Sequence, residues 1–352
     1  MSENCKEIRL PSGNDLILSS SPHIHDNQSV RKIMLKVIAA LLPAAAAGVF
    51  FFGFPAAGVI LLTLASCVAA EAIWFFLAKR PLSPLRDCSA ALTGLILALN
   101  LPPATPWWVC VLGGFIAIWV GKQVFGGLGH NPFNPALVAR VALLIALPAA
   151  LTTWTPTELE RCKSDFELST YATPLGQATM LKTTATPHGS AHGDIYAELT
   201  TDSAYFDYFI GNRGGSLGET SCLALLVGGI ALMLMKLIKW QIPLVFIGTV
   251  AAFTATVHFF APTMTPPALF HLMTGGLLLG AFFMATDMVT SPMTTWGCVI
   301  FAFGCGVITC VIRIWGSYPE GVSFSILFMN ALVPLIDRMC QLRPFGYVRK
   351  KA

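Results

Sequence analysis

The sequence has 352 residues, of which 55% are hydrophobic and only 11% are charged. Soluble domains carry about 25% charged residues, so this composition excludes an ordinary soluble enzyme and indicates an integral membrane protein. The net charge of +4 is small and no basic stretch is interleaved with aromatic residues, so nucleic acid is not an expected partner. The apolar runs are continuous rather than alternating, which favours membrane helices over a closed barrel.

About ten apolar segments follow one another along the chain, if about 20 apolar residues are taken as a full span. A polar N-terminal segment, 1–32, precedes the first membrane region, 33–151. A long polar interval, 152–213, separates it from the second region, 214–337, and the tail 338–352 ends the chain. The expected spans are 33–54, 55–78, 88–101, 106–124, 136–151, 221–237, 242–260, 268–286, 297–315 and 322–336.

Lysine and arginine placement orients these spans. An even number of spans with the N-terminus inside predicts that both termini are cytoplasmic and that the interval 152–213 is external. The interval carries eight acidic residues against four basic ones, as the rule expects. Arg313 does not fit this arrangement. The basic residues assigned to the cytoplasmic side are Arg31, Lys32, Lys79, Arg80, Arg86, Lys122, Lys236, Lys239, Arg343, Lys350 and Lys351.

The two membrane regions resemble each other. Leu-Thr-Gly-Leu-Ile-Leu-Ala-Leu at 92–99 parallels Met-Thr-Gly-Gly-Leu-Leu-Leu-Gly at 273–280, and each precedes a polar break that contains proline. Because each region has an odd number of spans, five, the second region must insert with the opposite orientation to the first. Paired broken segments in two such regions are typical of a site between inverted repeats. We therefore expect an all-α polytopic protein made of two inverted five-helix repeats. Chance similarity between apolar helices is the alternative.

Several polar residues stand out in this apolar chain. Glu71 lies inside the second span and Asp287 ends the eighth, and intramembrane carboxylates are functional-site candidates by default. We expect Glu71 and Asp287 to line a polar ion path on the cytoplasmic side, and a carboxylate bonded to a neighbouring helix is the alternative for Glu71. Glu219 fits either a functional role or pairing with a helix N-terminus. His271 is more typical of a buried, hydrogen-bonded histidine than of a proton relay.

The polar interval contains Leu-Ser-Thr-Tyr-Ala-Thr-Pro-Leu at 168–175. Pro174 disfavours helix at the preceding residue, so we expect Thr173 to present an accessible hydroxyl in an extended segment. A lone Ala-Thr-Pro is otherwise typical of a turn rich in serine and threonine. The ten cysteines include no Cys-x-x-Cys pair, so neither a zinc site nor an iron–sulfur cluster is expected.

An ordered set of motifs resembles the NqrB/RnfD family of membrane subunits over 21–346. Besides the threonine motif, the set comprises Phe-Gly-Gly-Leu-Gly-His-Asn-Pro-Phe-Asn-Pro-Ala at 125–136, Gly-Gly-Ser-Leu-Gly-Glu-Thr-Ser at 214–221, His-Leu-Met-Thr-Gly-Gly at 271–276, Gly-Ala-Phe-Phe-Met-Ala-Thr-Asp at 280–287, Val-Thr-Ser-Pro-Met-Thr at 289–294 and Gly-Ser-Tyr-Pro-Glu-Gly-Val-Ser-Phe at 316–324. Within the family the chain is more similar to the D subunits of bacterial Rnf complexes than to the B subunits of sodium-pumping NADH:quinone reductase, which are longer at the N-terminus.

The resemblance implies a urea-transporter-like fold and a membrane flavoprotein. Rnf complexes couple electron transfer between ferredoxin and NAD to sodium or proton movement. A dedicated transferase attaches FMN through its phosphate to the last residue of acidic-x-x-(Ser/Thr)-x-Ala-Thr, which implies Thr173 here, with Thr170 and Ala172 in the motif. The usual motif has Asp first and Gly before Ala, where this chain has Glu167 and Tyr171.

The resemblance also implies partners and a second flavin. Asn131 and Asn134 match an Asn-x-x-Asn that lies near a non-covalent riboflavin in the B subunits, although the adjacent prolines also fit simple turn formers. The expected partners are membrane lipid and the A, B, C, E and G subunits of an Rnf complex, above all RnfG, which carries covalent FMN itself. The expected location is the bacterial cytoplasmic (inner) membrane. A solute channel or transporter of the same fold is the alternative, but it has no need of the segment around Thr173.

Overall fold

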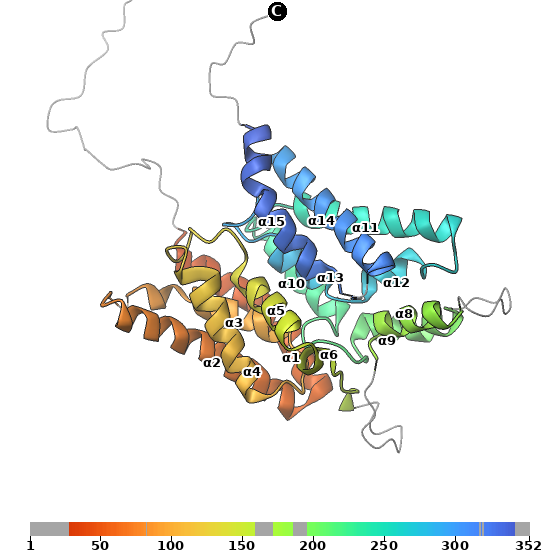
Figure 1. The fold of residues 1–352 in the computed structure, drawn as a ribbon, viewed down its shortest axis with the longest axis horizontal. Coiled ribbons are helices and arrows are strands. Elements are labelled where there is room, and N and C mark those ends of the chain that lie inside the picture. The colour runs from red at the N-terminus through yellow and green to blue at the C-terminus, as the bar shows by residue number, and fades with distance from the viewer. Residues whose placement is uncertain are drawn as a thin grey trace, which may run out of the picture.

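The computed structural model describes residues 28–81, 83–158, 172–185, 196–316, 318 and 320–341. This part of the chain is helical and contains no strand (Figure 1). Within it, five helices are long and apolar enough to cross a membrane, and four shorter apolar helices accompany them. The expectation of an all-α membrane protein is confirmed.

The first half of the fold begins with two long helices joined by a tight turn. Ser29 caps the first helix by accepting a hydrogen bond from the backbone N–H of Lys32. Gly53 makes the turn with a φ of 70°, a conformation that glycine adopts without strain. The elements are α1 (Val30–Phe52), α2 (Phe54–Leu77), the 3₁₀ turn η1 (Ser83–Asp87), α3 (Ser89–Leu99), α4 (Trp107–Phe115), its π-helical continuation η2 (Ile116–Gln123), α5 (Pro135–Ala146) and α6 (Pro148–Thr152).

The second half contains a helix that is interrupted inside the membrane region. The segment expected to span 268–286 ends its first part at Met273 and resumes at Leu277, and Gly275 in the gap has a φ of 68°. The elements are α10 (Cys222–Leu234), α11 (Gln241–Phe260), α12 (Ala268–Met273), α13 (Leu277–Leu279), the π-helix η4 (Gly280–Met284), α14 (Thr295–Trp315) and α15 (Val322–Met339).

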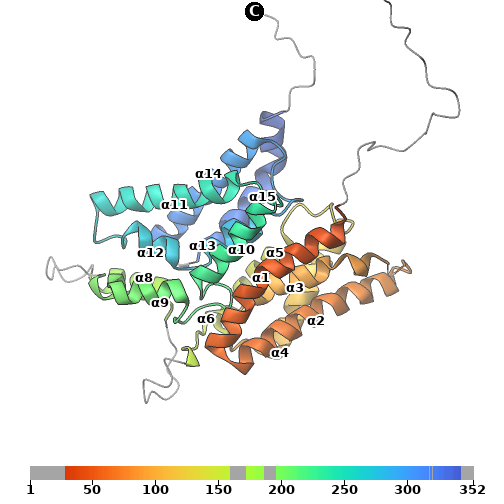
Figure 2. The same ribbon diagram turned by 180° about the vertical axis from the view of Figure 1, so that it is seen from behind.

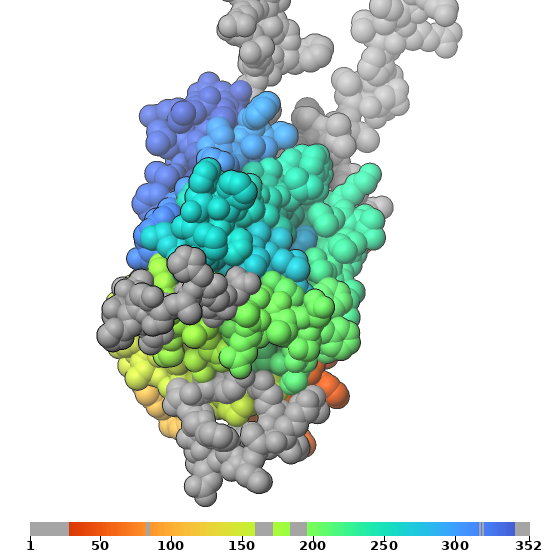
Figure 3. Space-filling model, turned by 90° about the vertical axis from the view of Figure 1, so that its right-hand side faces the viewer, coloured from red at the N-terminus to blue at the C-terminus, as the bar shows by residue number. Residues whose placement is uncertain are grey.

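Helical elements also occupy the described parts of the polar interval. They are α8 (Pro174–Ala185), the 3₁₀ turn η3 (Ala197–Thr200) and α9 (Asp202–Ile210). Their apolar residues, including Leu175 and Tyr208, form one cluster with Phe270 of α12. The Tyr196 hydroxyl donates to the carbonyl of Thr263 at 3.1 Å, and burial raises the pKa of this phenol. Figure 3 shows the green α8–α9 region on the surface between the two halves.

Small residues allow the membrane helices to approach closely. In the first half α2 packs against α3 and α4, and in the second half α11 packs against α12 and α14. Gly94 of α3 faces the α2 backbone, where a Cβ would lie 2.9 Å from the Leu64 Cα. The halves meet where α1 crosses α10 and where α5 contacts α15 (Figure 2). At the first crossing a Cβ on Gly228 would collide with the carbonyl oxygen of Ala40.

Candidate functional site

Thr173 is the N-cap of α8. Its hydroxyl oxygen accepts a hydrogen bond from the backbone N–H of Gly176 at 3.1 Å, and Pro174 is the first helical residue. The residue is only 5% exposed, so the expectation of an accessible hydroxyl is wrong. Thr173 itself lies outside the helix, as Pro174 predicted. The hydroxyl is buried because it folds back over the first turn of α8. Ala172 is half-buried beside it, whereas Thr170 and Glu167 lie outside the described residues.

A cavity of about 510 Å³ begins at the residue that follows Thr173 and lies between α8 and α9. Pro174 and Gln177 line it from α8, and Asp207 and Tyr208 line it from α9. Arg213, also in the lining, lies 5.6 Å from the centre of the Tyr208 ring. The cavity therefore combines an aromatic ring with an amide, a carboxylate and a guanidinium group.

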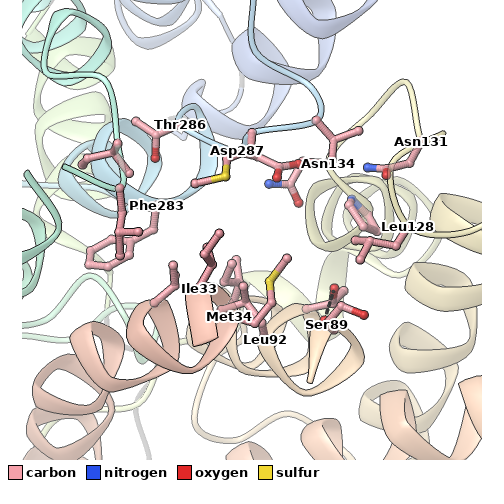
Figure 4. A pocket seen from close by; sticks show the side chains of 18 of the residues that line it. Ile33, Met34, Ser89, Leu92, Leu128, Asn131, Asn134, Phe283, Thr286 and Asp287 are labelled. Atoms are coloured by element: carbon pink, nitrogen blue, oxygen red, sulfur yellow. Dashed lines mark hydrogen bonds between the residues drawn. The ribbon is translucent and has the colours of Figure 1, made fainter. Parts of the chain in front are cut away.

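A second cavity, of about 110 Å³, lies between the two halves. Its polar lining includes Asn131, Asn134 and Asp287, and Figure 4 shows these three side chains along one side of it. Met34 and Leu92 lie on the other side in the same view. The structure thus brings together residues that are far apart in the sequence and that were predicted for two different roles.

Both asparagines have local structural roles, and their proximity to a riboflavin stays a prediction. The Asn131 side-chain amide donates to the carbonyl of Phe133 at 3.0 Å. Asn134 caps α5 by accepting from the backbone N–H of Ala136 at 3.1 Å, and its amide donates to the carbonyl of Met284 at 3.3 Å. The two residues therefore shape the loop before α5 and also line the cavity.

Glu71 is held in a buried ion pair. Its Oε1 lies 2.5 Å from the Nζ of Lys122, and both side chains are 3% exposed. The amide of Gln123 also donates to this oxygen at 3.0 Å, and Lys122 donates to the hydroxyl of Ser89 at 2.7 Å. The structure does not bring Glu71 into the wall of the second cavity, which Lys122, Ser89 and Asp287 line instead.

Lys122 is buried, so it is not a loop charge of the kind that the charge rule counts, and its assignment to the cytoplasmic side stays a prediction. It lies in the π-helical segment η2, buried against a helix that precedes it by about fifty residues. A single intramembrane lysine is tolerated when it pairs with a carboxylate, which is the arrangement observed here.

Arg140 on α5 is a buried residue that the sequence patterns did not single out. Its guanidinium donates to the backbone carbonyl of Asn100 and to the carboxylate of Glu320. Asn100 follows the last residue of α3, so the arginine satisfies a carbonyl at the C-terminal end of that helix. Glu320 precedes α15, so the pair connects the two halves. A lone arginine inside an apolar span was the signal, because such a residue needs a partner.

Arg313, the exception to the charge rule, has a similar role in the second half. It donates to the carbonyl of His271 at 2.8 Å and to the carbonyl of Thr274 at 3.2 Å, where α12 is interrupted. Arg313 therefore binds the carbonyl groups that are left free where α12 ends inside the protein, and it does not lie in a loop at the membrane surface. His271 is buried, and its Nε2 lies 2.7 Å from the Thr265 hydroxyl, which confirms the expectation of a hydrogen-bonded core histidine.

Glu219 does not cap α10. Its carboxylate accepts from the backbone N–H of Ser216 at 3.1 Å, and its backbone carbonyl accepts from Arg213. The cap of α10 is Ser221, whose hydroxyl accepts from the N–H of Ala224 at 3.3 Å. Glu219 therefore stabilises its own loop. Across the described residues no group of three His, Cys, Asp or Glu side chains is placed to hold a metal ion.

Comparison with known proteins gives a consistent result. Residues 17–346 match the NQR2, RnfD, RnfE family. The D subunit of the ion-translocating oxidoreductase complex of Stutzerimonas stutzeri is 48% identical, over 90% of this chain and 92% of the relative. The D subunit of the proton-translocating ferredoxin:NAD(+) oxidoreductase complex of Clostridium ljungdahlii is 44% identical, over 95% and 97%. The Na(+)-translocating counterpart of Acetobacterium woodii is 42% identical, over 96% and 97%.

Proposed function

The chain belongs to the NQR2, RnfD, RnfE family, and on that premise we propose that it is the D subunit of an ion-translocating ferredoxin:NAD(+) oxidoreductase complex. Relatives that it matches over nearly their full length carry this name. The proposal places the chain in the bacterial cytoplasmic membrane with both termini inside. It places α8 and α9 outside, where a flavin on this segment would exchange electrons with RnfG.

FMN esterified through its phosphate to Thr173 is the proposed electron carrier. The first turn of a helix presents backbone N–H groups and the positive end of the helix dipole, which suit a phosphate. Because Pro174 has no N–H, Leu175 and Gly176 supply the first donors of α8. A Cβ at Gly176 would lie 3.3 Å from the Thr173 oxygen, so glycine leaves room at that atom. The first turn of α8 therefore suits a phosphoester at Thr173, and the buried hydroxyl must turn outward to carry it.

The cavity between α8 and α9 supports the same proposal. Its volume of about 510 Å³ lies within the range of about 300–1,000 Å³ that is usual for small-molecule sites. Tyr208 contributes an aromatic ring to its wall, and Gln177 and Arg213 contribute an amide and a guanidinium group. In the structure these two groups donate to the carbonyls of Ala172, Met273 and Glu219. Bound FMN supplies the redox chemistry, and these side chains bind and orient it. This is the observation that favours a redox subunit over a solute channel.

We propose that the two halves are inverted five-helix repeats. The arrangement of α2 with α3 and α4 recurs in α11 with α12 and α14. The contacts of α1 with α10, and of α5 with α15, each join elements in matching positions of the two halves. Each half also contains a shortened or interrupted third element, α3 in the first half and α12 in the second.

The cavity between the halves is the proposed start of an ion path on the cytoplasmic side. Asp287 contributes a carboxylate to its wall, and Glu71 acts on it through Lys122. Riboflavin in this cavity stays a prediction. The volume of about 110 Å³ is below the usual range for small-molecule sites, and the amides of Asn131 and Asn134 already have protein partners, so the cavity must widen to admit a flavin.

In-gel flavin fluorescence after denaturation tests the proposed function. Thr173→Ala should abolish the fluorescence of this band while the complex still assembles, because the change is small and lies outside the membrane helices. Thr179→Ala is the matched control, since Thr179 lies on α8 and its hydroxyl bonds only within that helix, to the carbonyl of Leu175. Fluorescence that persists in Thr173→Ala would redirect the assignment to Thr170 or Thr179, and a non-fluorescent wild-type band would favour the channel.

A further inference from the structure

One chain of contacts connects the cavity between the halves to a partly exposed carboxylate. Asn134 in the cavity wall donates to the carbonyl of Met284, and the Asn100 amide lies 4.0 Å from the Met284 sulfur. The Asn100 carbonyl accepts from Arg140, which also pairs with Glu320. The Glu320 side chain is 19% exposed, whereas that of Arg140 is 3% exposed. In this series of contacts Arg140 therefore comes between the cavity and Glu320.

Arg140 occupies a position that would otherwise attract a cation. Carbonyl groups at the C-terminal end of a broken membrane helix carry partial negative charge and coordinate sodium ions or protons in transporters. Here the carbonyl of Asn100, at the end of α3, accepts a hydrogen bond from the guanidinium group of Arg140. Arg313 donates to the carbonyls of His271 and Thr274, where α12 ends. A guanidinium does not lose its proton in proteins, so the charge is permanent.

We propose that Arg140 is an electrostatic barrier that prevents cations from leaking through this subunit, between the cavity and the α8–α9 side. Its fixed positive charge occupies the cation position at the end of α3. A fixed arginine charge in a narrow passage repels sodium ions and protons alike. Glu320 holds the guanidinium in this position and balances its charge. The barrier is a property of the resting protein, so it goes beyond electron transfer and does not depend on flavin attachment.

Passive permeability of the purified complex in proteoliposomes tests the barrier. Uptake of radioactive sodium, and of protons reported by an internal pH dye, is measured under a potassium diffusion potential without ferredoxin or NADH. Arg140→Gln should raise the passive uptake by at least about tenfold, which corresponds to about 1.4 kcal/mol of barrier. The double variant Arg140→Gln/Glu320→Gln should leak to a similar degree, and it does not leave the Glu320 carboxylate without its counter-charge.

Arg140→Lys is the matched control, because it keeps a positive charge at this position and should retain wild-type permeability. An assembled double variant with wild-type permeability would overturn the proposal, as would an equal leak in Arg140→Lys. If both variants that lack the charge fail to assemble while Arg140→Lys assembles, Arg140 is a packing residue and the proposal is wrong. Because flavin fluorescence is scored separately in each sample, a failed flavin assignment leaves the leak result unaffected.

Discussion

Replacing Glu71 with glutamine should destabilise the protein by about 3–5 kcal/mol. Glu71 and Lys122 are 2.5 Å apart and both are buried, so the substitution leaves a buried ammonium group without its counter-charge. Gln123 and Ser89 still contact the site but carry no charge. Removing one partner of a buried pair costs more than the pair itself contributes, because the remaining charge has no water to solvate it.

The double variant Glu71→Gln/Lys122→Met separates the two contributions. It removes both charges and keeps similar side-chain volumes, so its stability should return to within about 1–2 kcal/mol of wild type. The free energy of unfolding is measured by SDS titration in mixed micelles. Glu198→Gln is the control, since it makes the same change at an exposed site and should stay within about 0.5 kcal/mol. A wild-type free energy in Glu71→Gln would refute the ion-pair reasoning.

The same variants test the proposed ion path. In Glu71→Gln, ion-coupled turnover should fall, or the cation concentration needed for it should rise, while the proposed FMN on Thr173 stays intact. The double variant should regain stability but not turnover, because Lys122 lines the cavity and its charge is lost as well. Wild-type turnover and cation dependence in both variants would leave Glu71 with a structural role only.

Two further predictions concern packing and topology. Gly228→Ala should destabilise the protein by about 1–3 kcal/mol, because the new methyl collides with the backbone carbonyl of Ala40, whereas Gly58→Ala meets nothing within 4 Å and should be neutral or stabilising by up to about 1 kcal/mol. The SDS titration compares the two, and equal effects would contradict the close crossing of α1 and α10. A reporter fused near Ser190 should read as external and one after Arg349 as cytoplasmic, and the opposite result at either site would mean a miscounted span.

Hydropathy and helix punctuation predicted the membrane elements well, because both are local properties of the chain. The turn at Gly53 and the start of α5 at Pro135 could be predicted from the sequence for this reason. The interruption of the eighth segment was harder to place. Gly275 and Gly276 marked it, but a run of apolar residues on both sides is equally compatible with a continuous helix, and only the bonds from Arg313 show where the carbonyls are freed.

The candidate site was predicted less completely, because its geometry depends on long-range contacts. Nothing near Lys122 in the sequence indicates that its partner is Glu71, and nothing near Arg140 indicates Glu320, which follows it by 180 positions. The burial of Thr173 had a local signal that was misread. A threonine before a proline that opens a helix is an N-cap, and an N-cap hydroxyl folds back over the first turn.

Mass spectrometry of the complex purified from its native membrane tests the central claim most directly. Cleavage after Lys163 and Lys182 releases a peptide that contains Thr170, Thr173 and Thr179. We predict that this peptide carries the mass of FMN less one water and that fragmentation places the adduct on Thr173. An unmodified peptide, or an adduct on Thr170 or Thr179, would contradict the assignment of Thr173 as the flavin-bearing residue.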